Sequence, residues 1–132
     1  MKRKIGAKNP VRCDILTAGG SYFNFLDGGE DDFEIEDIAH ALSNICRFGG
    51  HSKSFYSVAQ HSVYASHLVP SEDALAALLH DAHEAFVLDV MRPLKQLLPD
   101  YRKLEKKISN RVRERFGISF DDPESVKLAD LR

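Results

Sequence analysis

The residues of this sequence best suited to chemistry are an adjacent histidine and aspartate, His80-Asp81, within the run LHDAHE at positions 79–84. Four apolar residues precede the pair, so the run is expected to be a buried helix, where imidazoles and carboxylates need hydrogen bonds or a metal ion. At 100° per residue, His80 and Glu84 share one helix face, one turn apart, and Asp81 flanks them. The spacing predicts a buried polar site.

Two further residues are placed to complete a metal site. His61 lies on the inward face of a helix predicted at about 57–69, and Asp130 lies on a final helix. Imidazole nitrogens and carboxylate oxygens together are the ligands that divalent transition metals prefer. A single inward histidine is more often a satisfied core residue, but four such residues on three helices are more specific. We therefore predict that one divalent ion is bound by His61, His80, Asp81 and Asp130, with positions left for water or substrate.

The elements that must position these residues are mostly helices. Apolar spacing predicts helices at about 35–46, 57–69, 74–87 and 100–116, a short one that begins near Pro93 and ends at Pro99, and a last one after 121–123. Residues 11–35 show strand and turn signals around the aromatic run 21–26, which Asp27-Gly28-Gly29 closes. The expected fold is all-α, a helical bundle with a small N-terminal β-hairpin.

Two charged segments each allow two interpretations. The acidic residues of the first could form a calcium loop, but they lack EF-hand order, and an acidic helix start is favoured. They are Glu30, Asp31, Asp32, Glu34, Glu36 and Asp37. The basic residues of the second occupy the outer face of the 100–116 helix, where a solvated surface is favoured over phosphate contact. They are Arg102, Lys103, Lys106, Lys107, Arg111, Arg113 and Arg115.

Composition limits the class of protein. The 132 residues suit one domain, 1–132, and a net charge of −2 indicates neither a nucleic-acid nor a membrane surface. Cys13 and Cys46 have no CxxC spacing, which favours reduced thiols in a cytoplasmic protein. The basic start, residues 2–4, is followed by no apolar signal segment, and a frayed, solvated end is expected there. No run has the roughly 18 apolar residues of a membrane span.

With these residues in place, the pattern H…HD…D resembles the HD-domain metal-dependent phosphohydrolases, which are helical enzymes. The segments that carry the resemblance are Arg47-Phe48, fourteen residues before His61, the block LHDAHEAFVLDVMRPLK at 79–95, and KLAD at 127–130. Over roughly residues 20–132 the chain resembles bacterial 5′-deoxynucleotidases and related short prophage and phage HD hydrolases.

The resemblance implies a role for each matching residue. It gives the four predicted metal ligands, makes Glu84 a catalytic residue together with Asp81, assigns Arg47 to phosphate and Asp89 to the sugar 3′-hydroxyl. Phe48 stands where the classical enzymes have tryptophan, and Met91 where proline is frequent, so base and sugar preference stay open. From chemistry alone, Arg47 offers a planar fork for phosphate. Lys95 offers a point charge or is simply a solvated residue.

Three functions follow as expectations. The first is removal of phosphate from deoxynucleoside 5′-monophosphates, with one divalent ion (Mn, Co, Fe, Ni, Zn or Mg) as cofactor. The second is a phage-type deoxynucleoside triphosphate triphosphohydrolase, and the third is a non-catalytic HD module that binds a nucleotide or protein. His83 and His51 are possible ligands of a second metal or acids. A homo-oligomer is expected, and relatives generally continue with more helix after Asp130, which suggests a C-terminally short form.

Overall fold

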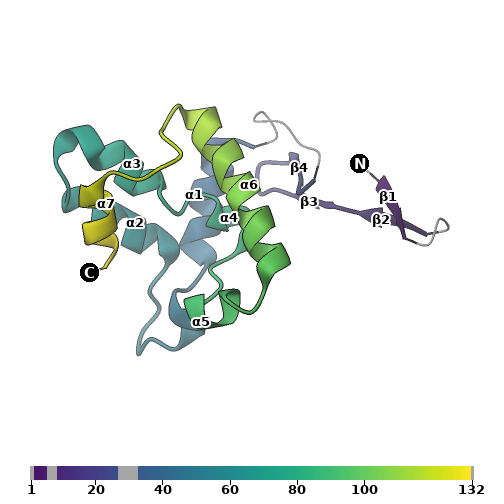
Figure 1. The fold of residues 1–132 in the computed structure, drawn as a ribbon, viewed down its shortest axis with the longest axis horizontal. Coiled ribbons are helices and arrows are strands. Elements are labelled where there is room, and N and C mark those ends of the chain that lie inside the picture. Colours follow the sequence, from purple (N-terminus) through teal and green to yellow (C-terminus); the bar gives the residue numbers. More distant parts are fainter. Residues whose placement is uncertain (1, 6–8, 27–32, 132) are drawn as a thin grey trace.

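The computed structural model describes residues 2–5, 9–26 and 33–131, and this part of the chain is mostly helical with two short antiparallel hairpins near the N-terminus (Figure 1). This confirms the predicted helical class with an N-terminal hairpin. The helices are α1 (Ile35–Asn44), α2 (Val58–His67), α3 (Ala74–Leu79), α4 (Glu84–Val87), α5 (Arg92–Lys95), α6 (Pro99–Phe116) and α7 (Glu124–Asp130), with 3₁₀ turns η1 (Phe48–Gly50) and η2 (Ser71–Asp73). None of these helices is long and apolar enough to cross a membrane.

The hairpins differ in how well the sequence predicted them. Strands β3 (Asp14–Leu16) and β4 (Tyr22–Asn24) pair as expected for the 11–35 region, although β4 ends before Phe25. Strands β1 (Lys2–Ile5) and β2 (Asn9–Arg12) form a second hairpin, so the prediction of a frayed end was wrong for these residues. The predicted turn at 27–29 lies outside the described residues.

Asp37 explains the acidic start of α1. Its carboxylate, 4% exposed, accepts hydrogen bonds from the backbone N–H groups of Gly19 at 2.7 Å and Glu34 at 2.9 Å. A capping box of this kind satisfies donors that the first turn of a helix leaves open. Asp37 therefore fastens the β3–β4 turn to α1, and the helix-start interpretation holds for this residue, while Glu30, Asp31 and Asp32 lie outside the described residues.

The main core joins the β3–β4 hairpin to α1, α4 and α6. Phe23 from β4 stacks on Phe86 from α4 with ring centroids 3.8 Å apart, and Phe33 contacts both rings. Ile108 and Val112 on α6 are buried against this cluster. The aromatic stack holds α4, and with it Glu84, in a fixed place under α6 (Figure 1).

A second, smaller core attaches α7 to α2 and α3 at the end of the molecule far from the hairpins (Figure 1). It consists of Ala65, Ala77, Val126 and Ala129, all at most 4% exposed. Alanine side chains are short, so the helices approach closely. Because α7 carries Asp130, this small core decides where that carboxylate lies.

The helix predicted at 74–87 is not continuous. It divides into α3 and α4, and residues 80–83 between them form turns in which N–H groups bond three residues back, as Ala82 does to Leu79 and Glu84 to Asp81. The Nδ1 of His80 donates to the Ala77 carbonyl at 2.6 Å, an acceptor that a regular α-helix would offer to the backbone. The metal-type residues therefore sit on a tightened turn.

The burial expected for the helix that leads to His80-Asp81 is also only partly correct. Ala77 and Leu79 are buried, but Leu75 is 52% exposed and Leu78 is 38% exposed. On α2, the apolar spacing predicts Val58, Ala65 and Leu68 on the inward face; Val58 and Ala65 are buried, but Leu68 is 37% exposed. Burial is therefore concentrated on the sides of α2 and α3 that face α1, α4 and α7.

Candidate metal centre and adjoining cleft

The structure brings the four predicted metal ligands together. One donor atom from each of His61, His80, Asp81 and Asp130 lies within 4.8 Å of the other three. The Oδ1 of Asp130 is 2.8 Å from Nε2 of His61 and 3.1 Å from Nε2 of His80, and Oδ2 of Asp81 is also 3.1 Å from Nε2 of His80. Residues up to 69 positions apart thus converge on one point.

The two imidazoles are oriented by contacts behind them. Since a backbone carbonyl can only accept, Nδ1 of His80 donates to Ala77, which directs Nε2 into the cluster. The NH1 group of Arg47 lies 3.0 Å from Nδ1 of His61 and can only donate, so Nδ1 accepts and Nε2 donates to Asp130. Both imidazoles are almost fully buried, at 2% and 5% exposure.

The charges in the cluster shift one another's pKa values. Burial by itself lowers the pKa of His80, but hydrogen bonds to Asp130 and Asp81 outweigh it and raise this pKa to about 11. Burial opposes ionisation of Asp81, yet His80 holds the pKa of that carboxyl below its usual range. Hydrogen bonds from His61 and His80 hold the pKa of Asp130 far below its usual range. Two carboxylates are thus kept ionised.

These residues fit a divalent cation. Two imidazole nitrogens and two carboxylate oxygens are a hard-to-intermediate donor set, and their mutual separations suit a shared ion of the Mn, Fe, Co, Ni or Zn group. The carbonyl behind His80 provides the orienting contact that metal-binding histidines usually have. The exposed fraction of the Asp130 side chain, 40%, leaves the cluster open on one side.

Glu84 lies beside the cluster with one oxygen unsatisfied. The residue is 6% exposed, and its Oε1 is buried without a hydrogen-bond partner among the described residues. Burial, followed by the Asp81 and Asp89 carboxylates, raises the pKa of Glu84 to about 10. A buried polar atom with no partner is costly in a folded protein and is frequently found at functional sites. Glu84 is therefore prepared to bond a group that enters from solvent.

A cleft of about 490 Å³ opens next to the cluster and contains every substrate-contact residue that the resemblance implied. Asp81, Glu84 and Asp130 are among the residues that line it. The other lining residues are Arg47, Phe48, Asp89, Val90, Met91, Arg92, Pro93 and Lys95. Its volume falls in the range that holds small ligands.

The backbone at the edges of this cleft is strained at two positions. Phe48 has φ of 59° and Leu88, which precedes Asp89, has φ of 69°, both in the left-handed region that costs a non-glycine residue about 1–3 kcal/mol. Phe48 is 53% exposed, and the Arg47 guanidinium lies over its ring at 4.7 Å. The fold holds an exposed aromatic ring and a carboxylate toward the same opening.

Lys95 and His83 are tied together by a residue that the sequence did not single out. Glu105 on α6 accepts from Nζ of Lys95 at 2.8 Å and from Nε2 of His83 at 3.3 Å. Burial opposes ionisation of Glu105, but these two partners hold its pKa below the usual range. Lys95 is therefore a fixed charge at the cleft rather than a solvated residue, and His83 faces Glu105 rather than the four-ligand cluster.

The position of Arg113 differs from the one that its sequence pattern predicted. It was expected on the solvated face of α6, but it is 6% exposed. Its guanidinium donates to the carbonyl of His80 at 3.3 Å, to the carbonyl of Ser119 at 2.9 Å and to the carboxylate of Asp122 at 2.7 Å. Arg113 therefore braces the turn that carries His80.

Replacing Arg113 with methionine is expected to lower the free energy of unfolding by about 2–3 kcal/mol, because Asp122 and two carbonyls lose a charged donor. Urea denaturation followed by circular dichroism measures this loss. The matched control is Lys103→Met on the same helix, an exposed residue where a change below about 0.5 kcal/mol is expected. Equal effects of the two substitutions would contradict the bracing role.

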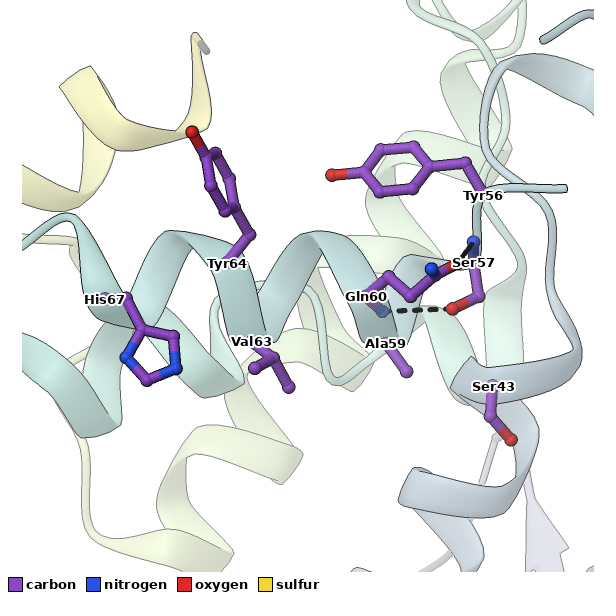
Figure 2. Close-up of a pocket in the computed structure, with 8 residues that line it drawn as sticks. All are labelled: Ser43, Tyr56, Ser57, Ala59, Gln60, Val63, Tyr64 and His67. Carbon is purple, nitrogen blue, oxygen red and sulfur yellow. Dashed lines mark hydrogen bonds between the residues drawn. The ribbon is translucent and has the colours of Figure 1, made fainter. Parts of the chain in front are cut away.

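A further hollow, of about 740 Å³, lies on the other side of α2 and has no part in the cluster (Figure 2). Figure 2 shows Tyr56, Val63 and Tyr64 around it, beside the capping contact between Ser57 and Gln60 that starts α2. None of the four metal-type residues lines it.

His51 is exposed in a loop and shares no described contact with the cluster.

Comparison with known proteins shows homology without an activity. The chain is 51% identical over 117 residues to the uncharacterized protein YfdR of Escherichia coli K12, which covers 89% of the chain and 66% of YfdR. It is 35% identical over 120 residues to the uncharacterized protein RCAP_rcc00048 of Rhodobacter capsulatus, covering 83% of the chain and 61% of that protein. No family model matches the chain. The chain spans less than two thirds of the length of either relative.

Proposed function

We propose that this protein is a metal-dependent phosphohydrolase of the HD type that removes phosphate from deoxynucleoside 5′-monophosphates. The observation that carries the proposal is the convergence of His61, His80, Asp81 and Asp130 beside a buried carboxyl, Glu84, with an unsatisfied oxygen. When bound, a divalent ion would supply positive charge to phosphate oxygens and lower the pKa of water. The four residues named would hold it.

The residues around this centre are assigned to proton transfer and to contacts with the phosphate, sugar and base of the substrate. Glu84, with its raised pKa, holds a proton that it can donate to a leaving oxygen. A positive charge near Asp81 would reduce the part of this pKa shift that Asp81 causes, and the Glu84 carboxylate could then act as a base. Lys95, held by Glu105, contributes a positive charge on the wall of the cleft. Asp89 offers an acceptor for a sugar hydroxyl, and Phe48 an exposed ring on which a base can stack.

In this scheme Arg47 would lose its hydrogen bond to His61 when the metal is bound, which frees its NH1 group for a phosphate. It now donates to Nδ1 of His61, and a guanidinium cannot donate to a nitrogen that carries a proton. When the His61 proton moves from Nε2 to Nδ1, which ligation through Nε2 requires, this hydrogen bond is lost. Arg47 is then available to the cleft, whose wall it already forms.

A second candidate is the triphosphohydrolase, and one observation favours it. The cleft wall carries three cations, Arg47, Arg92 and Lys95, and the described residues contain no ion-pair partner for Arg92. A single phosphate dianion needs fewer positive groups than a polyphosphate chain. Both candidates share the metal centre and differ only in the bond that is broken.

A nucleotide screen tests both candidates. The protein is incubated with Mn²⁺ or Co²⁺ and each deoxynucleoside 5′-mono- or triphosphate, with a chelator-treated sample as control, and products are separated by chromatography. Release of inorganic phosphate from monophosphates is expected. Release of tripolyphosphate would identify the triphosphohydrolase, and a metal-loaded protein that turns over no nucleotide would leave the non-catalytic binding module. Gel filtration tests the predicted homo-oligomer.

A further inference from the structure

A second cavity reaches the same cluster from the side of α6. It has a volume of about 370 Å³ and shares Asp81, Glu84 and Lys95 with the cleft described above. Its remaining wall comes from His80 and His83, from α6, and from residues 120 and 122. The buried carboxyl of Glu84 therefore stands between two hollows, one on the side of the predicted sugar contact and one on the side of α6.

The basic residues around this cavity are of two kinds. Arg113 and Lys95 are committed, because Arg113 bonds Asp122 and two carbonyls and Lys95 bonds Glu105. Arg102 and Lys106 have no hydrogen-bond or ion-pair partner among the described residues. They are four positions apart on α6 and so lie on one side of the helix. Two unpaired cations face this cavity.

Three of the four acidic residues around the cavity, all except Glu84, are already paired with basic groups. Asp122 is 2.7 Å from Arg113, Glu105 is shared by Lys95 and His83, and Asp81 is 3.1 Å from Nε2 of His80. Apart from Glu84, the charged groups left without a partner in the wall are therefore those of Arg102 and Lys106. The side chains of Ser109 and Asn110 add hydroxyl and amide groups to the same wall. Unpaired cations with neutral donors are the features of an oxyanion site.

The unsatisfied oxygen of Glu84 is an independent sign that a polar group enters here. Glu84 is more than nine-tenths buried, lines this cavity as well as the cleft, and has Oε1 without a partner among the described residues. A buried oxygen without a hydrogen bond gains one when a polar group enters from solvent, whereas it gains nothing from an apolar ligand. The unpaired cations of the wall and the unpartnered oxygen of Glu84 therefore both favour a polar ligand over an apolar one.

We propose that the α6 cavity is a second phosphate subsite, in which Arg102 and Lys106 bind a phosphate group beyond the metal cluster. Two sources share this chemistry, the distal phosphates of a polyphosphate substrate and the inorganic phosphate released by hydrolysis. The assignment of the anion to substrate or product rests on the proposed function. The existence of an anion site is independent of the proposed function, because it is inferred from the unpaired basic residues of the cavity wall.

Calorimetric titration with inorganic phosphate tests the site in chelator-treated protein, where neither metal nor turnover contributes. Arg102→Gln/Lys106→Gln is expected to weaken phosphate binding about tenfold, because two charged donors are lost. The matched control, Lys103→Gln/Lys127→Gln, removes the same charge from exposed positions outside the cavity and should bind like wild type. Circular dichroism checks that both variants fold. Equal affinities of wild type and the Arg102/Lys106 variant, or no binding by wild type, would overturn the proposal.

Kinetics of the metal-loaded protein then separate the two sources. If distal phosphates occupy the cavity, the Arg102/Lys106 variant raises KM for triphosphates and leaves KM for monophosphates unchanged. If released phosphate occupies it, product inhibition by inorganic phosphate weakens and both KM values stay the same. A variant with neither change would contradict the subsite. A protein without any turnover would contradict the proposed function. The calorimetric titration with inorganic phosphate would still show whether the anion site exists.

Discussion

Replacing His80 with alanine is expected to abolish metal binding and nucleotide hydrolysis together. Nε2 of His80 is the atom that both carboxylates of the cluster approach, at 3.1 Å each, so its loss removes one ligand and leaves Asp81 and Asp130 to repel each other. We expect metal affinity to fall by at least about 100-fold and turnover by about 1000-fold or more. Asp81→Ala should behave in the same way.

Metal content after dialysis against a defined concentration of Mn²⁺ measures the first effect, and the nucleotide assay measures the second. His67→Ala is the matched control, because His67 is an exposed histidine on α2 outside the cluster. It should retain metal and activity. If His80→Ala bound the metal as tightly as wild type, the four-residue site would be wrong.

Replacing Glu84 with glutamine is expected to separate chemistry from metal binding. Glu84 is not among the four clustered donors, so metal content should stay at the wild-type level. Glutamine fills nearly the same volume but can neither give up nor accept the carboxyl proton, and turnover should fall by about 100- to 10,000-fold. Most of that loss should be in kcat rather than KM.

The pH profile adds a readout that a packing defect would not produce. If Glu84 transfers a proton, the variant should lose one limb of the wild-type dependence of kcat/KM on pH. Glu72→Gln, at an exposed position in η2, is the matched control and should keep both rate and profile. Full activity in Glu84→Gln would show that its assigned role is wrong.

The cluster was predictable because histidine and aspartate are rare in buried helices. Placing its residues together required no details of side-chain geometry. His61, His80, Asp81 and Asp130 needed only the correct inward faces of three helices, which apolar periodicity indicates. The break between α3 and α4 was not predictable, because every residue from 74 to 87 is compatible with a helix. At this break, Nδ1 of His80 donates to the Ala77 carbonyl, a contact that residue spacing does not predict.

Arg113 and Glu105 escaped prediction for a different reason. In the sequence, Arg113 is one of seven basic residues on a single helix, and only the return of the chain at 117–122 buries it beneath Ser119 and Asp122. Glu105 gains its importance from Lys95, ten residues earlier, through a tertiary contact. The hairpin β1–β2 lacked an alternating apolar pattern, so its basic residues resembled a solvated end.

Three alanines set the tolerance of this protein to sequence change. Ala65, Ala77 and Ala129 are at most 4% exposed and separate α7 from its neighbours by no more than a methyl group. A larger side chain at any of them would cost about 1–3 kcal/mol or displace α7. Since Asp130 is the last residue of that helix, the displacement would move a carboxylate that must stay within bonding distance of two imidazoles. Positions without any reactive group can therefore accept almost no variation, and harmful substitutions in this protein should extend well beyond the residues that perform its chemistry.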